Sequence, residues 1–218
     1  ESFFIYSKSL RSGYNVLTAD INGDGDHEIL VAPKNGATAH VRVFNTDGTL
    51  MTTFFAYQQE LKAGAVLKLA DLTGDGLAEL LVIPEGKAGS HLRAYQFNTT
   101  TSTFELIAQE FLFGTEFRGT MNITIADVTG DGNKEVIASP ITGGTAHVRV
   151  YEFANNDFTL LDEFFAYGDT RIGAKIMTGD LDGNGIRDLV IAPQGKDGGS
   201  NIRTYKFNTT TEEFELMD

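Results

Sequence analysis

The sequence predicts an all-β protein, a β-propeller of four four-stranded blades, from three observations. A unit of about 54 residues occurs four times along the 218-residue chain. Each unit holds short runs of β-branched and aromatic residues, separated by turn signals rich in Gly, Asn and Asp. No window shows the sustained 3.6-residue apolar period that a helix requires. Short strands that recur at this spacing are typical of propeller blades.

The clearest repeated element is an acidic stretch followed by an apolar run and a proline. It reads ADINGDGDHEILVAP at 19–33, ADLTGDGLAELLVIP at 70–84, ADVTGDGNKEVIASP at 126–140 and GDLDGNGIRDLVIAP at 179–193. The lead aspartates lie 51, 56 and 53 residues apart, at Asp20, Asp71, Asp127 and Asp180. This spacing sets the phase of the repeat.

Two further motifs complete each unit. A strand motif such as AHVRVFN at 39–45 follows the proline, and an aromatic motif, FFAY at 54–57 and 164–167 or FLFG at 111–114, closes the unit. No linker separates the units, so we expect a single propeller domain over 1–218. The predicted blades are 10–57, 61–111, 117–167 and 171–218, with 2–7 added to the last.

The two ends of the chain are complementary in sequence. Joined, they read FELMD-ESFFIY, which resembles the internal FELIAQEFLFG at 104–114. We therefore expect residues 2–7 to supply an outer strand to the last blade and to close the ring, which would remove a free sheet edge. Two alternatives stay open: two chains that form an eight-bladed ring, and a fragment of a larger propeller.

The acidic stretches have the spacing of an oxygen cage, D-x-[N/T/D]-G-[D/N]-G-x-x-[E/D]. Side chains at positions 1, 3, 5 and 9 and the carbonyl at position 7 would surround a hard cation, and Ca²⁺ suits six to eight oxygen ligands. Asp-Gly clusters also form ordinary turns. Four in-phase loops with three carboxylates each nevertheless favour a metal-binding role over a plain turn. The predicted side-chain ligands are Asp20, Asn22, Asp24 and Glu28; Asp71, Thr73, Asp75 and Glu79; Asp127, Thr129, Asp131 and Glu135; Asp180, Asp182, Asn184 and Asp188. The predicted carbonyl ligands are those of Asp26, Leu77, Asn133 and Ile186.

The loops differ from an EF-hand. Their closing acid stands at position 9 rather than 12, and their flanks are strands rather than helices. We expect the two loops with Thr at position 3 to bind more weakly, through a water molecule. Up to four Ca²⁺ ions, one per blade, are predicted.

These residues resemble the FG-GAP (VCBS-type) repeats of integrin α-subunit propellers and of bacterial surface proteins. The resemblance covers essentially the whole chain, and the acidic loop is its most specific part. It implies a calcium-loaded propeller, an extracellular or cell-surface location, and a role in adhesion or ligand binding. It also implies about seven blades, whereas this chain has four repeats.

Polar residues recur on the strand after each proline. His40, His91 and His147 share one position, which Asn201 takes in the fourth unit, and Arg42, Arg93, Arg149 and Arg203 lie two residues further on. Residues two apart share one face of a strand. They would either bind an anion or a sugar hydroxyl or make a repeated structural hydrogen bond.

Composition excludes several function classes. The formal net charge is −13, which argues against binding to nucleic acid or to an anionic membrane. The chain has no Cys, and no apolar run long enough to insert into a membrane. No GxSxG or HExxH motif is present, so we expect a non-catalytic module that binds a protein or glycan, with a monomer favoured over a dimer. The alternatives are a lectin and a glycan hydrolase; the lack of Trp counts against a lectin.

Overall fold

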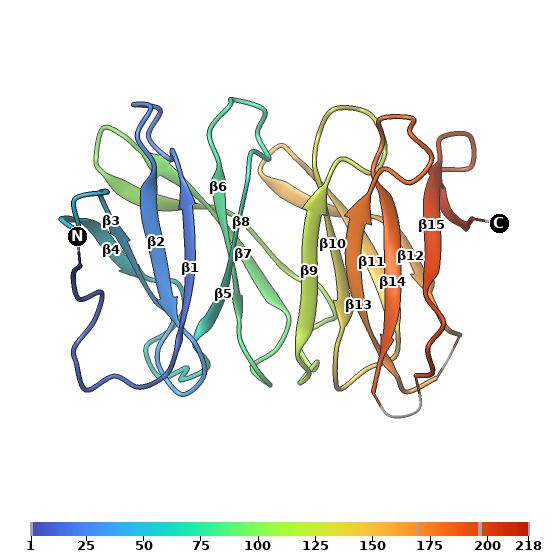
Figure 1. Cartoon of the computed structure of the whole chain (residues 1–218), viewed down its shortest axis with the longest axis horizontal. Coiled ribbons are helices and arrows are strands. Elements are labelled where there is room, and N and C mark those ends of the chain that lie inside the picture. The colour runs from blue at the N-terminus through green and yellow to red at the C-terminus, as the bar shows by residue number, and fades with distance from the viewer. Residues whose placement is uncertain (1, 169, 196–197, 218) are drawn as a thin grey trace. The chain divides into compact units, whose positions relative to one another are not determined.

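The computed structural model describes residues 2–168, 170–195 and 198–217. These residues form sixteen β-strands and no helix, in four four-stranded antiparallel sheets (Figure 1). The prediction of an all-β protein with four four-stranded sheets is therefore confirmed. The chain divides into two compact units, one ending at Phe111 and the other beginning at Leu112. No described segment forms a helix of the length and apolarity that a membrane crossing requires.

The first unit holds two sheets in which strand order follows chain order. The first sheet consists of β1 (Tyr14–Ala19), β2 (Glu28–Pro33), β3 (His40–Phe44) and β4 (Leu50–Phe55). The second consists of β5 (Ala65–Ala70), β6 (Glu79–Pro84), β7 (His91–Asn98) and β8 (Thr103–Phe111).

The second unit repeats this arrangement. The third sheet consists of β9 (Met121–Ala126), β10 (Glu135–Pro140), β11 (His147–Ala154) and β12 (Asp157–Phe165). The fourth consists of β13 (Gly173–Gly179), β14 (Asp188–Gln194), β15 (Arg203–Asn208) and β16 (Glu213–Leu216). Every strand range falls inside the blade range predicted for its repeat.

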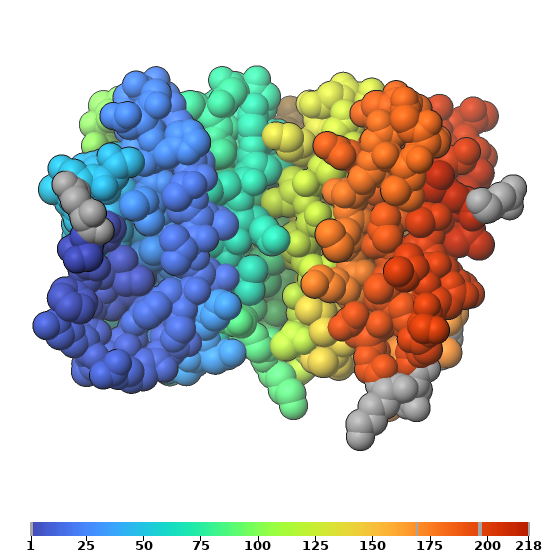
Figure 2. All heavy atoms as spheres, in the orientation of Figure 1, coloured from blue at the N-terminus to red at the C-terminus, as the bar shows by residue number. Residues whose placement is uncertain are grey.

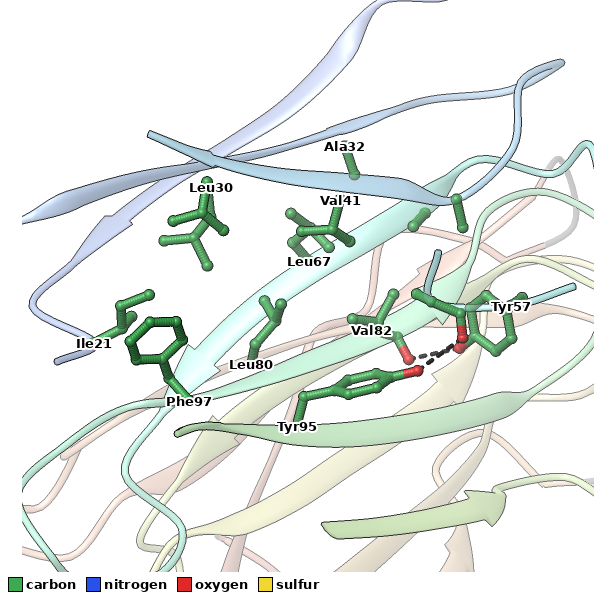
Figure 3. Close-up of a cluster of buried hydrophobic side chains, with 14 residues drawn as sticks. Ile21, Leu30, Ala32, Val41, Tyr57, Leu67, Leu80, Val82, Tyr95 and Phe97 are labelled. Atoms are coloured by element: carbon green, nitrogen blue, oxygen red, sulfur yellow. Dashed lines mark hydrogen bonds between the residues drawn. The ribbon is translucent and has the colours of Figure 1, made fainter. Parts of the chain in front are cut away.

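The core of each unit lies between its two sheets. The strand after the acidic loop is apolar on both faces, and β6 and β10 are buried at every residue. In the first unit, Leu30 and Val41 pack against Leu67 and Leu80 (Figure 3). In the second unit, Val148, Ile176, Leu189 and Ile191 form the equivalent cluster. Burial of apolar surface is thus what joins the two sheets of a unit.

No strand forms at residues 2–7 in this structure, and closure of the ring by this segment stays a prediction. The described residues before β1 contain no strand and lie on the first sheet, where Phe3 contacts Phe44 with ring centroids 5.2 Å apart. The Tyr6 hydroxyl donates to the carbonyl of Val31 at 3.1 Å. The first sheet therefore holds this segment through its aromatic side chains, and the fourth sheet has its own outer strand, β16.

Candidate metal centre

Each acidic repeat forms the turn between the first two strands of its sheet. Residues 20–27, for example, join β1 to β2. Within a unit, the two loops lie at the same end of their sheets (Figure 1). Side chains of one loop also approach the glycines of the other. A Cβ added to Gly23 would lie 3.3 Å from the Leu77 side chain, and one added to Gly130 would lie 2.5 Å from Ile186. The loops are therefore paired, with one pair in each unit.

The lead aspartate organises the backbone of its own loop. The carboxylate of Asp20 accepts the N–H of Gly23 at 2.6 Å and the N–H of Gly25 at 2.9 Å. These glycines have φ values of 78° and 93°, a region that residues with a Cβ disfavour, so they allow the chain to turn back onto the carboxylate. The same two bonds form at Asp71, Asp127 and Asp180.

The closing acid at position 9 is buried in all four loops. Glu28, Glu79, Glu135 and Asp188 are at most 2% exposed. In each loop, one carboxylate oxygen accepts the backbone N–H of the residue after the lead aspartate, at 2.7 to 3.1 Å. Burial of an ionised carboxylate is costly unless a cation or several donors compensate it. Each loop therefore holds one buried acid beside further carboxylates.

The pKa values reflect this arrangement. Burial raises the pKa of Glu135 to about 7, and the charges of Asp131 and Asp127 add to the increase. Burial likewise raises the pKa of Glu28 and Glu79. A cation at the loop centre would reverse the effect, because it stabilises the ionised form of every carboxylate around it.

The fourth loop brings its acids closest together. Carboxylate oxygens of Asp180, Asp182 and Asp188 lie within 4.8 Å of one another, and among the described residues this is the one cluster of three acids or histidines with that geometry. Three oxygens at this separation fit a hard divalent cation, whose oxygen ligands lie about 2.3–2.6 Å from the metal. The donor set of this loop therefore suits Ca²⁺.

In the other loops, side-chain amide and hydroxyl groups donate hydrogen bonds to some of the carboxylate oxygens. The Asn22 amide nitrogen donates to Asp24 at 2.9 Å and to Glu28 at 3.5 Å, which places its positive end where a cation would be held. The Thr73 hydroxyl donates to Glu79 at 3.3 Å. These contacts lie among the predicted ligands, and rotation of the Asn22 amide would present its oxygen instead.

Two contacts of the acidic loops were not evident from the repeat pattern. The Gln96 amide donates to Asp75 at 3.1 Å, and Asn133 donates to Asp131 from its side chain at 3.0 Å and from its backbone at 2.8 Å. At all four residues of position 7, the backbone N–H donates to the side chain at position 5. Ligation by the carbonyls of position 7 stays a prediction.

The four repeated arginines form a second recurring arrangement, which we call the arginine clamp. In each clamp the guanidinium donates to a backbone carbonyl 37 residues earlier at 2.7 to 2.9 Å, and covers the aromatic ring of the next residue at 4.8 to 5.2 Å. The clamps consist of Arg42 with Ile5 and Tyr6, Arg93 with Ala56 and Tyr57, Arg149 with Leu112 and Phe113, and Arg203 with Ala166 and Tyr167.

The repeated histidines pack on aromatic rings. His40, His91 and His147 stack on Phe55, Phe111 and Phe165, with ring centroids 4.1 to 4.4 Å apart. Burial lowers the pKa of all three, and the neighbouring arginine lowers it further. Neutral, stacked imidazoles beside engaged arginines favour a structural role, while ligand binding at these positions and at Asn201 stays a prediction.

The aromatic partners of the clamps were not identified from the sequence as residues that connect neighbouring sheets. Tyr57 donates to the carbonyls of Val82 at 2.7 Å and His91 at 2.5 Å, and Tyr167 makes the same pair of bonds in the second unit. The constant separation of 37 residues between arginine and carbonyl is a signal in the sequence that could have revealed them.

These observations define a class: an all-β repeat protein with propeller-like blades and one acidic loop in each blade. A family model described as "FG-GAP-like repeat" matches residues 20–82 and 71–138, which together cover more than half of the chain. The chain therefore belongs to the family of FG-GAP repeat β-propellers. A curated relative, integrin alpha-4 of Xenopus laevis, is 25% identical across 88% of this chain. The chain spans only 20% of that relative's length.

Three solved structures that share this fold are rhamnogalacturonan lyases. The exotype rhamnogalacturonan lyase YesX matches with a TM-score of 0.60 and 14% identity, covering 89% of this chain and 45% of its own. The PL11 rhamnogalacturonan lyase of Bacillus licheniformis has a TM-score of 0.57 at 12% identity, and the lyase YesW has 0.52 at 13%; each match covers 92% of this chain and 50% of the lyase. At these identities the likeness shows the fold alone, and this chain spans about half of each lyase.

Proposed function

We propose that this chain is a calcium-stabilised, non-catalytic β-propeller module, which binds a protein or glycan ligand in a surface or secreted protein. Each of its four acidic loops holds one Ca²⁺. Membership of the FG-GAP repeat family and the integrin alpha-4 relative support the adhesion or structural role and the extracellular location.

The buried closing acid is the observation that carries the proposal. All four loops bury a carboxylate at the same position, beside exposed or half-buried acids of the same loop. A turn alone does not account for a buried acid at the same position of every loop, whereas a cation site does, because the metal would compensate the charge that burial destabilises. The cation would be held by the side chains at positions 1, 3, 5 and 9.

Calorimetric titration of the metal-free chain with Ca²⁺ tests the proposal. We expect up to four ions to bind and the melting temperature to rise with calcium, because a ligand of the folded state stabilises it. Replacing one lead aspartate at a time, as in Asp20→Asn or Asp71→Asn, should remove one ion each. No heat of binding and an unchanged melting curve in EDTA would refute it.

A glycan-active protein is the second candidate. It is favoured by the fold neighbours, which are rhamnogalacturonan lyases, although their low identity carries only the fold. A glycan array in the presence of Ca²⁺ tests a lectin function, and release of unsaturated products from rhamnogalacturonan tests a lyase. Turnover that is lost on replacing an acid outside the loops would overturn the non-catalytic assignment.

We also propose that the four sheets form one closed ring, and so one domain, in which Ser2, Phe3 and Phe4 continue the outer edge of the fourth sheet. Phe3 contacts Phe44 as Phe54 contacts Tyr95, so residues 3–6 lie on the first sheet as 54–57 lie on the second. Moreover, β16 has four residues, whereas β8 and β12 have nine each.

A disulfide would test this ring. Thr53, Gln109 and Glu163 each pair with the arginine of their own sheet, and Ser2 would pair with Arg203 in the same way. The chain has no Cys, so Ser2→Cys with Arg203→Cys gives a clean background. An oxidised monomer is expected, with a pair at Ser9 and Arg203 as control. A covalent dimer would favour an eight-bladed ring of two chains. The absence of any crosslink would contradict both the four-bladed and the eight-bladed ring.

A further inference from the structure

A cleft opens between the two acidic loops of the second unit. Its volume is about 440 Å³, and it is lined by the ends of β9 and β13 and by both loops, including Asp127, Lys134, Thr178 and Arg187. The two loops stand side by side in the space-filling view, the first in yellow and the second in orange (Figure 2). The size is that of a site for a small ligand.

The walls of the cleft are fixed by contacts between the sheets. The Arg187 N–H donates to the Asp127 carbonyl at 3.2 Å, and Ile186 packs against Gly130. Deeper in the unit, the Ile176 N–H donates to the Asn122 side chain at 2.5 Å. Because backbone groups hold both sides, the cleft is a preformed feature of this unit.

Two cationic side chains line the cleft without a protein partner. Lys134 is half-buried and Arg187 is exposed. In the part of the chain that the structure describes, neither makes an ion pair or a side-chain hydrogen bond, whereas Arg149 pairs with Glu163. The Asp127 carboxylate is engaged by the N–H groups of its own loop. The cations are therefore available to a ligand.

The first unit lacks these cations at the equivalent positions. His27 precedes the closing acid where Lys134 does so in the third repeat, and Ala78 stands in the place of Arg187. Leu69 occupies the position of Thr178. Since the first unit has the same strand order and the same paired loops without these residues, the fold does not require them.

We propose that this cleft binds a carboxylate-bearing sugar, with Lys134 and Arg187 holding the carboxylate and the Thr178 hydroxyl bonding to the ring. Arginine and lysine bind carboxylates through charge-assisted hydrogen bonds. The volume of about 440 Å³ suits one sugar residue better than an extended acidic peptide. The inference rests on the proposed calcium loading, because the loop carboxylates around the cleft repel an anion until a cation neutralises them.

The test is an NMR titration of the full-length ¹⁵N-labelled chain with glucuronate, in excess Ca²⁺ and in EDTA. Glucose is the uncharged control. We expect glucuronate to shift the amide signals of Lys134, Thr178 and Arg187 with calcium present, and glucose to leave them unchanged. The double variant Lys134→His with Arg187→Ala, which installs the residues of the first unit, should weaken binding at least tenfold. Its calcium stoichiometry and melting temperature should match those of the parent chain.

A gain of function completes the test. His27→Lys with Ala78→Arg should create a second glucuronate site in the first unit. Equal affinity of the parent and the double variant would overturn the inference, as would tighter binding of a short Asp-Glu peptide. A normal calcium isotherm without any glucuronate response would overturn it and leave the proposed function intact. If calcium fails to bind, the proposed function fails. A glucuronate response in EDTA would then keep the cleft as the binding site but overturn its dependence on calcium. The absence of any glucuronate response would overturn both the proposed function and this inference.

Discussion

The guanidinium of Arg93 lies 4.8 Å over the ring of Tyr57 and donates to the carbonyl of Ala56 at 2.7 Å. Arg93 belongs to β7 of the second sheet, whereas Ala56 and Tyr57 follow β4 of the first. The Tyr57 hydroxyl returns the contact by donating to Val82 of β6 (Figure 3). This clamp therefore ties the outer strand of one sheet to the middle of the next.

Arg93→Met should destabilise the chain by about 2 kcal/mol, because it removes a charged hydrogen bond and a cation–π contact and leaves the Ala56 carbonyl with the Tyr95 hydroxyl as its remaining donor. Tyr57→Phe should cost about 1 kcal/mol, since only the hydroxyl is lost. Urea unfolding measures both, and the exposed Arg11→Met is the control. A cost for Arg93→Met as small as that of the control would contradict a structural role of the clamp.

Gly64→Ala should destabilise the chain by about 3 kcal/mol or more. Gly64 has a φ of 71°, and an added Cβ would lie 2.4 Å from the backbone of Lys34. Gly36 provides a matched control: its φ is 80°, but a Cβ there would meet nothing within 4 Å. Gly36→Ala should thus cost only the conformational strain, about 1 kcal/mol. Equal costs for the two variants, by thermal or urea unfolding, would show that the close approach of Gly64 to Lys34 is unimportant.

Without metal, the chain should lose stability as pH rises from about 4.5 to 7. The pKa of Glu135 is raised to about 7 in the folded state from a usual value of 4.5, chiefly by burial. The unfolded chain therefore releases this proton first, and its ionisation favours unfolding until Glu135 ionises in the folded state too. The urea midpoint in EDTA should fall across this window, and less steeply for Glu135→Gln. Calcium should abolish the fall, since the cation favours the ionised carboxylate; an equal slope in Glu135→Gln would refute the assignment.

Asp182→Asn should lower the calcium affinity of the fourth loop by about tenfold or more, because a carboxylate ligand becomes a neutral amide. Its effect on the metal-free chain should stay within about 0.5 kcal/mol, since Asp182 is exposed and the amide oxygen can still accept the N–H of Asn184. Calorimetry with Ca²⁺ and unfolding in EDTA separate the two effects. Undiminished affinity would exclude Asp182 as a ligand.

The sequence by itself determined the repeat, the strands and the place of the acidic loops. The lead aspartates occur in phase, and a turn with glycines at positions 4 and 6 is a local property of the chain. The position of Asp20 and its three equivalents at the start of each acidic loop could therefore be predicted from spacing alone. The sixteen strands follow from local patterns of apolar and β-branched residues for the same reason.

Only the tertiary structure decided what depends on contacts between sheets. The partner of Arg93 lies 37 residues earlier, and no local pattern says whether its guanidinium faces a ligand or a carbonyl. Residues 2–7 have the sequence of a strand, yet Tyr6 and Phe3 are held by the first sheet as side chains. The cationic cleft likewise arises where the loops of two sheets meet, because Lys134 and Arg187 are 53 residues apart and converge only through packing.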